Sequence, residues 1–297
     1  MKRFGGVHTI MPTPFQDDGE LDLPSLERLT DFLISRGVDG LVVLGVMGEA
    51  PKLGEAEQEE VIRTTVKAAA GRVPVFAGSG AAGSDLAVRK SARALELGAA
   101  GLLVAPPPVQ HDEVIFSYYR RINDAVDHPI ILHDYPQATG IRLTPELVVR
   151  LHAELKNVAV IKLEESPSAP KVTALRRLGS EIGIVGGLGG IFFLEELTRG
   201  ADGMMTGFSF PEVLVAIQRA FQEGEHDEAA RIFYRACPLL RYEFQPGTGL
   251  ALRKEVYRQR GAISSAFVRH PGTQIDELLR RELAAVLEFC ALGEVAA

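Results

Sequence analysis

Short apolar runs alternate with longer helix-like segments along most of the chain. The runs are three to five residues long and consist mainly of Val, Ile, Leu, Met and Ala, without the polar alternation of a half-exposed strand. They therefore predict strands buried on both faces, as in a parallel sheet. We predict eight strands, at residues 7–11, 41–44, 73–77, 102–105, 129–133, 158–161, 182–185 and 204–206.

Helix signals follow most of these runs: apolar residues at helical spacing, proline in the first turn and glycine at the end. They predict helices at residues 24–36, 55–70, 84–97, 113–126, 169–178 and 211–223, and a further helix beginning at Pro145. Eight strand–helix units in about 220 residues match the size of a (β/α)8 barrel. A doubly wound open sheet is the alternative, but no GxGxxG sequence follows the first strand. We therefore predict an α/β fold, a (β/α)8 TIM barrel over residues 1–224 with its active site at the C-terminal strand ends.

The strand pattern stops after Gly224. Residues 226–242, 250–260 and 275–292 are helix-like instead. We predict a C-terminal helical extension over residues 225–297, and its apolar faces need to cover the barrel or a neighbouring subunit.

The sixth run ends on a lysine. In a strand the side chains alternate, so Lys162 shares one face with Val158 and Val160, while Ala159 and Ile161 take the other. If the first face points to the barrel axis, Lys162 lies at the C-terminal end of a strand, where barrel enzymes have their active sites. The alternative is a lysine that ends the strand and extends its ammonium group to water.

A lysine in a dry barrel mouth can act as a nucleophile. Desolvation disfavours the ammonium form and lowers the pKa from ~10.4, so the neutral amine can add to a ketone and form a Schiff base. This chemistry needs neither a metal nor a cofactor, and no cluster of His and carboxylate residues here has metal spacing. We predict no metal and no cofactor.

The other candidates follow the predicted strands. The GVMG sequence at residues 45–48 can bind only through its backbone N–H groups, which suits a carboxylate or phosphate, and a plain tight turn is the alternative. The GGLGG sequence at residues 186–190 is either a close-packing loop or a phosphate cradle. The remaining candidates are Thr13, His133, Tyr135, Glu164, Thr206 and Gly207. Of these, a histidine in the position of His133 is more often a structural, hydrogen-bonded residue than a base.

Composition narrows the class of protein. The net charge of −7 and the pI near 5.6 argue against nucleic acid or an anionic membrane surface as a partner. The two cysteines make no metal spacing, the first residues lack the apolar core of a secretory signal, and no apolar run approaches 18 residues. We predict a cytoplasmic protein with free thiols.

Several motifs carry a resemblance to a known family. They are PTPF at residues 12–15, GxxGE at 45–49, a turn with Pro136, Thr139 and Gly140, and the lysine at 162. With this ordered set, the chain resembles the dihydrodipicolinate synthase / N-acetylneuraminate lyase family of class I Schiff-base aldolase barrels over nearly its whole length. The resemblance implies a (β/α)8 barrel, usually tetrameric, that holds a 2-keto acid as a Schiff base, with Lys162 as the Schiff-base lysine.

The chain departs from the synthase pattern. It has Val46 and Met47 where the synthase has hydroxyl residues, Pro108 and His133 where it has tyrosines, and Ala138 where it has an arginine. It is more similar to the 2-keto-3-deoxy-L-arabonate dehydratase branch. The shared stretches are LGxxGEAPKL at 44–53, APPP at 105–108, DYP at 134–136, KxE at 162–164, GADGxMTG at 200–207 and RYE at 241–243.

The function expected from the residues and the resemblance is that of a lyase dehydrating a 2-keto-3-deoxy sugar acid. Lys162 forms the imine, the backbone of residues 45–48 (Gly45, Val46, Met47 and Gly48) with Thr13 holds the C1 carboxylate, and Glu164, His133 or Tyr135 transfers protons. Gly186, Thr206 and Gly207 line the sugar end.

Three alternatives stay open: aldol cleavage or pyruvate-dependent aldol chemistry, condensation of the 4-hydroxy-tetrahydrodipicolinate synthase type, and a non-catalytic keto-acid-binding barrel. An aldolase with a phosphorylated substrate requires a cation beside residues 186–190, and Arg199 is the nearest in sequence. The expected partners are a small 2-keto acid and further copies of this chain, as a tetramer.

Overall fold

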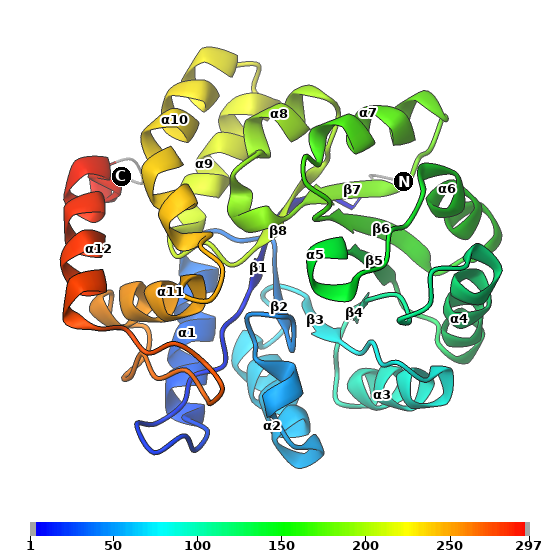
Figure 1. Cartoon of the computed structure of the whole chain (residues 1–297), viewed down its shortest axis with the longest axis horizontal. Helices are drawn as coiled ribbons and strands as arrows, with labels where there is room; N and C mark the ends of the chain where they lie inside the picture. The colour runs from blue at the N-terminus through cyan, green and yellow to red at the C-terminus, as the bar shows by residue number, and fades with distance from the viewer. Residues whose placement is uncertain (1–3, 295–297) are drawn as a thin grey trace.

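The eight strands form one closed parallel barrel (Figure 1). The structure, a computed structural model, describes residues 4–294. The strands are β1 (Gly6–Ile10), β2 (Gly40–Val43), β3 (Val75–Gly78), β4 (Gly101–Val104), β5 (Ile130–Asp134), β6 (Val158–Leu163), β7 (Gly183–Gly186) and β8 (Gly203–Thr206). Each strand pairs with its neighbours in sequence, and β1 pairs with β8 to close the ring. The predicted (β/α)8 fold is confirmed.

Helices connect the strands and most of them cover the outside of the barrel, whereas the short helix after the fifth strand lies by the strand ends at the centre (Figure 1). They are α1 (Leu23–Ser35), α2 (Glu55–Ala69), α3 (Ser84–Glu96), α4 (Asp112–Ala125), α5 (Pro136–Thr139), α6 (Pro145–Glu154), α7 (Ala169–Arg177), α8 (Phe193–Thr198) and α9 (Pro211–Gln222). The sequence analysis did not predict α5 and α8, because four and six residues are too few to show a helical repeat of apolar positions. Asp22 and Thr144 cap α1 and α6 by accepting hydrogen bonds from backbone N–H groups of the first turn.

Alternating side chains build two apolar layers. The inner layer fills the barrel with residues from all eight strands: Ile10, Val42, Phe76, Leu103, Ile131, Val160, Val185 and Met205. The outer layer lies between the strands and the helices and contains, for example, Leu41, Leu102 and Ile161. The barrel is therefore a packed core, open for chemistry only at its end.

An irregularity in β6 changes one prediction. Ile130 pairs with Val158 and the next residue, Ile131, pairs with Val160, so Ala159 is an extra residue in the strand. Val158 consequently packs in the outer layer, whereas Val160 packs in the inner one. The prediction that Val158 shares a face with Lys162 is wrong, because strict alternation breaks at the bulge.

Three more helices follow the barrel: α10 (His226–Glu243), α11 (Gly249–Gln259) and α12 (Glu277–Cys290). The predicted boundary between residues 224 and 225 falls in the turn between α9 and α10, while residues 1–3 and 295–297 of the two predicted segments lie outside the described residues. We call residues 225–294 the helical tail. Its buried residues Phe233, Leu240 and Leu252 pack in one apolar cluster with Phe193 and Ile217 of the barrel's own helices. The tail therefore covers this chain's own barrel.

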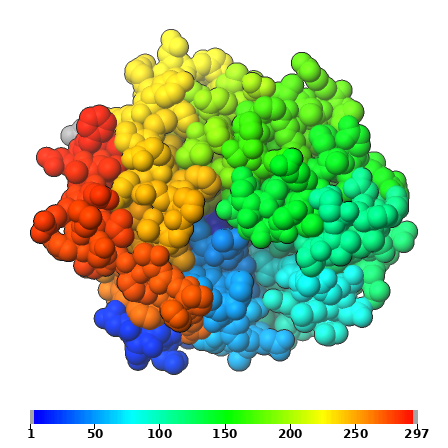
Figure 2. Space-filling view, in the orientation of Figure 1, coloured from blue at the N-terminus to red at the C-terminus, as the bar shows by residue number. Residues whose placement is uncertain are grey.

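The tail also reaches the open end of the barrel. Figure 2 shows a hollow at the centre of the molecule, between α10 and α11 on one side and the segments around α5 on the other.

None of the helices in residues 4–294 combines the length and hydropathy needed to cross a lipid bilayer.

Candidate active site

Lys162, Glu164 and His133 form a buried polar cluster at the barrel mouth. Each is less than a tenth exposed. Lys162 Nζ donates a hydrogen bond to Glu164 Oε2 and lies 3.1 Å from His133 Nε2. The same carboxylate oxygen is 2.7 Å from His133 Nε2. Because an ionised carboxylate only accepts, Glu164 Oε2 takes one hydrogen bond from the lysine and one from the histidine.

Strand pairing brings these three side chains together. His133 on β5 lies directly beside Lys162 on β6, and the Glu164 N–H continues the ladder by donating to the Asp134 carbonyl at 2.8 Å. Glu164 is two residues beyond Lys162 and so points to the same side. Its second oxygen, Oε1, accepts a 2.9 Å hydrogen bond from the backbone N–H of Leu188, after β7. The glutamate is thereby fixed between two strand ends.

A glycine makes room for Glu164. A Cβ on Gly187 would lie 2.3 Å from Glu164 Cγ, far inside van der Waals contact. The glycine-rich sequence after β7 thus allows the carboxylate to approach the loop backbone.

Burial sets the protonation of the cluster. Desolvation lowers the pKa of Lys162, and the nearby Arg253 charge acts in the same direction, while Glu164 opposes both. Desolvation and the Lys162 charge lower the pKa of His133, so the imidazole is neutral near pH 7. For Glu164, burial alone would raise the pKa, but the Lys162 charge and the contacts with His133 outweigh it and hold the pKa below its usual range. The site therefore contains an ionised carboxylate beside an amine whose loss of a proton is made easier.

The turn after β2 offers free backbone donors. Leu44 and Glu49, which flank residues 45–48, both have left-handed backbone conformations, with φ of 58° and 54°. Within the turn, Gly48 N–H donates to the Gly45 carbonyl and Glu49 N–H to the Val46 carbonyl. Among the described residues, the N–H groups of Val46 and Met47 have no hydrogen-bond partner. Two adjacent free N–H groups are an arrangement that suits an anion.

Most of the predicted site residues meet at one cavity of about 80 Å³. Its lining residues are Ile10, Gly45, Val46, Met47, Leu103, Tyr135, Lys162, Glu164, Gly189, Thr206, Gly207, Phe244 and Arg253. An adjoining cavity of about 520 Å³ shares Gly45 and Val46 with it and is lined by His133 as well. The Tyr135 ring stacks on the His133 ring, with centroids 5.8 Å apart, and burial raises the pKa of Tyr135. At Gly207, a Cβ would collide with Met47 Sδ, so this glycine leaves space for the methionine side chain.

Three predicted residues lie at the edge of this arrangement. Thr13 is buried beneath the turn, where its hydroxyl donates a 2.7 Å hydrogen bond to the Gly48 carbonyl. Gly48 contributes that carbonyl and lines neither cavity. Gly186 also lines neither cavity: a Cβ on it would meet the buried carboxyl group of Glu196 on α8, and Gly189 lines the cavity instead.

The sequence analysis missed Phe244 and Arg253, both from the helical tail. It took Arg199 as the nearest cation to residues 186–190, and this was wrong. Arg199 donates to Thr173 Oγ1, whereas Arg253 Nη2 lies 3.1 Å from the position of a Cβ on Gly189. No local motif links residue 253 to the barrel mouth, because only the path of the tail brings it there.

The sequence profile of the Dihydrodipicolinate synthetase family matches residues 3–289. The chain belongs to this family. One curated relative, L-2-keto-3-deoxyarabonate dehydratase of Azospirillum brasilense, is 35% identical over 293 residues, which cover 96% of this chain and 94% of the relative. Another, 4-hydroxy-tetrahydrodipicolinate synthase of Endomicrobium trichonymphae, is 31% identical over 291 residues, which cover 96% and 98% of the two chains.

A solved structure agrees with these relatives. Dihydrodipicolinate synthase from Rhodopseudomonas palustris has a TM-score of 0.92 and 37% identity, with coverage of 96% of this chain and 97% of that one. The resemblance to the family is thus confirmed, and this member is a lyase of the Schiff-base type. The two curated relatives carry out different reactions, so membership alone leaves the substrate open.

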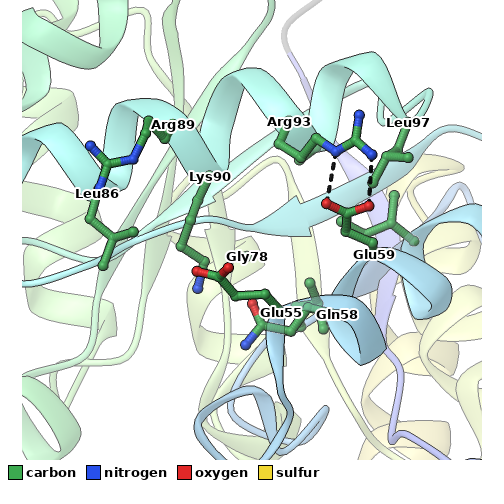
Figure 3. A pocket seen from close by; sticks show the side chains of 12 residues that line it. Glu55, Gln58, Glu59, Gly78, Leu86, Arg89, Lys90, Arg93 and Leu97 are labelled. Atoms are coloured by element: carbon green, nitrogen blue, oxygen red, sulfur yellow. Dashed lines mark hydrogen bonds and ion pairs between the residues drawn. The ribbon is translucent and has the colours of Figure 1, made fainter.

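A third cavity lies away from the cluster. It has a volume of about 210 Å³ and lies between α2 and α3, where Arg93 donates two hydrogen bonds to Glu59 at 2.8 and 2.7 Å (Figure 3). Its lining includes Lys90 and Glu55 but none of Lys162, Glu164 and His133. The buried lysine, carboxylate and imidazole that suit lyase chemistry therefore lie in the barrel mouth and not in this cavity. Among residues 4–294, no group of three or more His, Cys, Asp or Glu side chains is arranged to hold a metal ion.

Proposed function

We propose that Lys162 forms a Schiff base with a 2-keto acid and that the protein dehydrates a 2-keto-3-deoxy sugar acid. One observation carries the proposal: a buried lysine with a lowered pKa donates directly to an ionised carboxylate that is itself fixed by the Leu188 N–H. Such an amine is a nucleophile next to a proton carrier.

The geometry suggests the role of each group. Lys162 Nζ attacks C2 of the keto acid, and the ketone oxygen leaves as water, which produces a protonated imine. The free N–H groups of Val46 and Met47 bind the C1 carboxylate. Glu164 then removes a proton from C3, and the electron pair moves to the imine nitrogen. The resulting enamine expels the C4 hydroxyl, which takes the proton back from Glu164 and leaves as water. Hydrolysis of the imine then releases the product and the free amine.

Two features favour dehydration over condensation. Val46 and Met47 supply no side-chain hydroxyl for the proton relay of the synthase pattern, and the relative from Azospirillum brasilense is a dehydratase by name. The same imine also supports cleavage between C3 and C4, which makes an aldolase the second candidate. Product analysis separates them, because dehydration keeps all the carbon atoms in one molecule and cleavage yields two.

Borohydride trapping tests the proposed lysine. The protein is incubated with pyruvate or a 2-keto-3-deoxypentonate, reduced, digested and analysed by mass spectrometry. We expect an adduct on Lys162 and none in Lys162→Ala. Lys156→Ala, which removes an exposed lysine paired with Asp127, is the matched control and should trap as the unchanged protein does. Turnover by a folded Lys162→Ala variant would exclude the mechanism.

Assembly and location are further proposals. Homo-oligomerisation, as a tetramer, and a cytoplasmic location follow from the family resemblance and the cysteine content. Sedimentation velocity at micromolar protein concentration tests the first, and a monomer there would contradict it.

A further inference from the structure

Arg253 on α11 is an incompletely paired cation inside the barrel mouth. The residue is 8% exposed. Nε lies 3.3 Å from Glu243 Oε2, and Nη1 lies 3.5 Å from the thioether sulfur of Met47, which is a weak acceptor. Among the described residues, Nη2 has no hydrogen-bond partner. A buried guanidinium N–H without an acceptor is costly, so the site is complete only when an acceptor from outside the chain is present.

The position of this guanidinium is built into the fold. Glu243 at the end of α10 accepts hydrogen bonds from the backbone N–H of Ser209, at 3.2 Å, and from its hydroxyl. The carboxylate in turn holds the Nε side of Arg253. The guanidinium is therefore fixed on one side and free on the other, a geometry that suits ligand binding better than a simple ion pair.

A glycine opens the space in front of the free nitrogen. A Cβ on Gly189 would lie 3.1 Å from Arg253 Nη2 and 2.8 Å from the Phe244 ring. Gly189, Arg253 and Phe244 line the same cavity of about 80 Å³ as Lys162. Nη2 thus faces a cavity whose other wall carries the amine.

We propose that Arg253 binds an acceptor oxygen at the far end of the substrate, beyond C4. This inference rests on the proposed function, which places the C1 carboxylate at the Val46 and Met47 N–H groups and C2 on Lys162. A substrate held at these two points has its remaining carbons free to extend across the cavity. The acceptor is the oxygen of a terminal hydroxyl or of a second carboxylate, since a guanidinium N–H donates to either. The tail helix then decides how long and how polar a keto acid the barrel accepts.

The test compares a long and a short keto acid. Pyruvate has no atom beyond C3, whereas a 2-keto-3-deoxypentonate carries oxygens there. In Arg253→Met we expect kcat/KM for the pentonate to fall, mainly because KM rises. This loss should be roughly 10- to 100-fold greater than any loss in the rate at which borohydride traps pyruvate on the protein. In Arg253→Lys, which keeps the positive charge but has a shorter reach, we expect the same selective loss. A matched pair of acids ending in an alcohol and in a carboxylate then shows which terminus loses more.

Arg258→Met is the control, because this arginine lies on the same helix but is exposed and paired with Glu255. It should behave as the unchanged protein, and melting temperatures of all variants report whether they fold. Equal losses for pyruvate and the pentonate in both Arg253 variants would overturn the inference, since Arg253 would then act on C1 or on the amine. No loss for the pentonate would overturn it as well. A wild-type protein that traps no keto acid would instead refute the proposed function, and this inference would fall with it.

Discussion

Lys162 Nζ donates a hydrogen bond to the carboxylate of Glu164, two residues further along the same strand end. Both side chains are more than nine-tenths buried, so the pair is held away from bulk water. A strand places residues i and i+2 on one side, and this spacing is the shortest that allows such a contact in extended backbone. The proposed nucleophile and its proposed proton carrier are therefore positioned by a single strand end, and the loop after β7 adds a hydrogen bond to the carboxylate.

Glu164→Gln separates proton transfer from imine formation. The amide keeps the size of the side chain and an oxygen that can accept from the Leu188 N–H, but it cannot take up a proton. We expect kcat for dehydration to fall by about 10²- to 10⁴-fold, while borohydride still traps pyruvate on Lys162. Exchange of the pyruvate methyl hydrogens with deuterated water, followed by NMR, should slow by a similar factor. Glu165→Gln is the control, because Glu165 pairs with Lys171 and Arg142 rather than with Lys162. Unchanged exchange in Glu164→Gln would rule out Glu164 as the base.

The rate of imine formation should depend on pH through Lys162. Only the neutral amine attacks, so the rate of pyruvate capture rises with pH below the lysine pKa and levels off above it. Because burial lowers the pKa of Lys162, we expect this plateau to begin below pH 10.5. Glu164 opposes that shift by stabilising the ammonium form, so in Glu164→Gln the plateau should begin at a still lower pH. The measurement is the initial rate of borohydride-trapped adduct across the pH range. A plateau that moves upward in the variant would contradict the assigned electrostatics.

Lys254 in the helical tail should be important for stability. Its ammonium group is fully buried and donates to Glu49 Oε1 at 2.6 Å and to the Phe267 carbonyl at 2.8 Å. Lys254→Met removes this partner from the buried Glu49 carboxylate, which keeps Lys52 at 2.8 Å and the Arg269 N–H at 3.1 Å. We therefore expect a loss of about 1–3 kcal/mol of unfolding free energy. Because Glu49 follows the turn that we propose binds the C1 carboxylate, we also expect a higher KM for the keto acid. Urea denaturation and steady-state kinetics measure the two effects.

Lys156→Met provides the comparison for this stability change. Its ammonium group forms an ion pair with Asp127 on the surface, where both side chains are mostly exposed. Surface pairs contribute little, so the expected change is within about 1 kcal/mol. Equal effects of the two lysine substitutions would show that the buried contact between Lys254 and Glu49 contributes no more to stability than a surface ion pair.

The sequence by itself determined the parts of this protein that depend on neighbours along the chain. Buried strands can be recognised in the sequence as short apolar runs. The prediction that eight strand–helix units close into a barrel follows from their number and order. The same local pattern singled out Lys162 at the end of its apolar run with Glu164 just after it, and left the turn after β2 as either a backbone anion site or a plain tight turn. Within these elements, the side-chain direction is set by the strand's two-residue repeat.

Only the tertiary structure decided which distant residues meet at the open end of the barrel. The bulge at Ala159 moves Val158 to the outer layer, and the pairing of β5 with β6 brings His133 to the amine. The path of the tail carries Phe244 and Arg253 over the cavity and joins Lys254 to Glu49. These contacts join residues that are 29 to more than 200 positions apart in the sequence. The spacing of apolar residues along the chain therefore does not predict them. Local sequence predicts most elements and most side-chain directions, whereas packing of the completed chain decides where strict alternation breaks and which side chains touch.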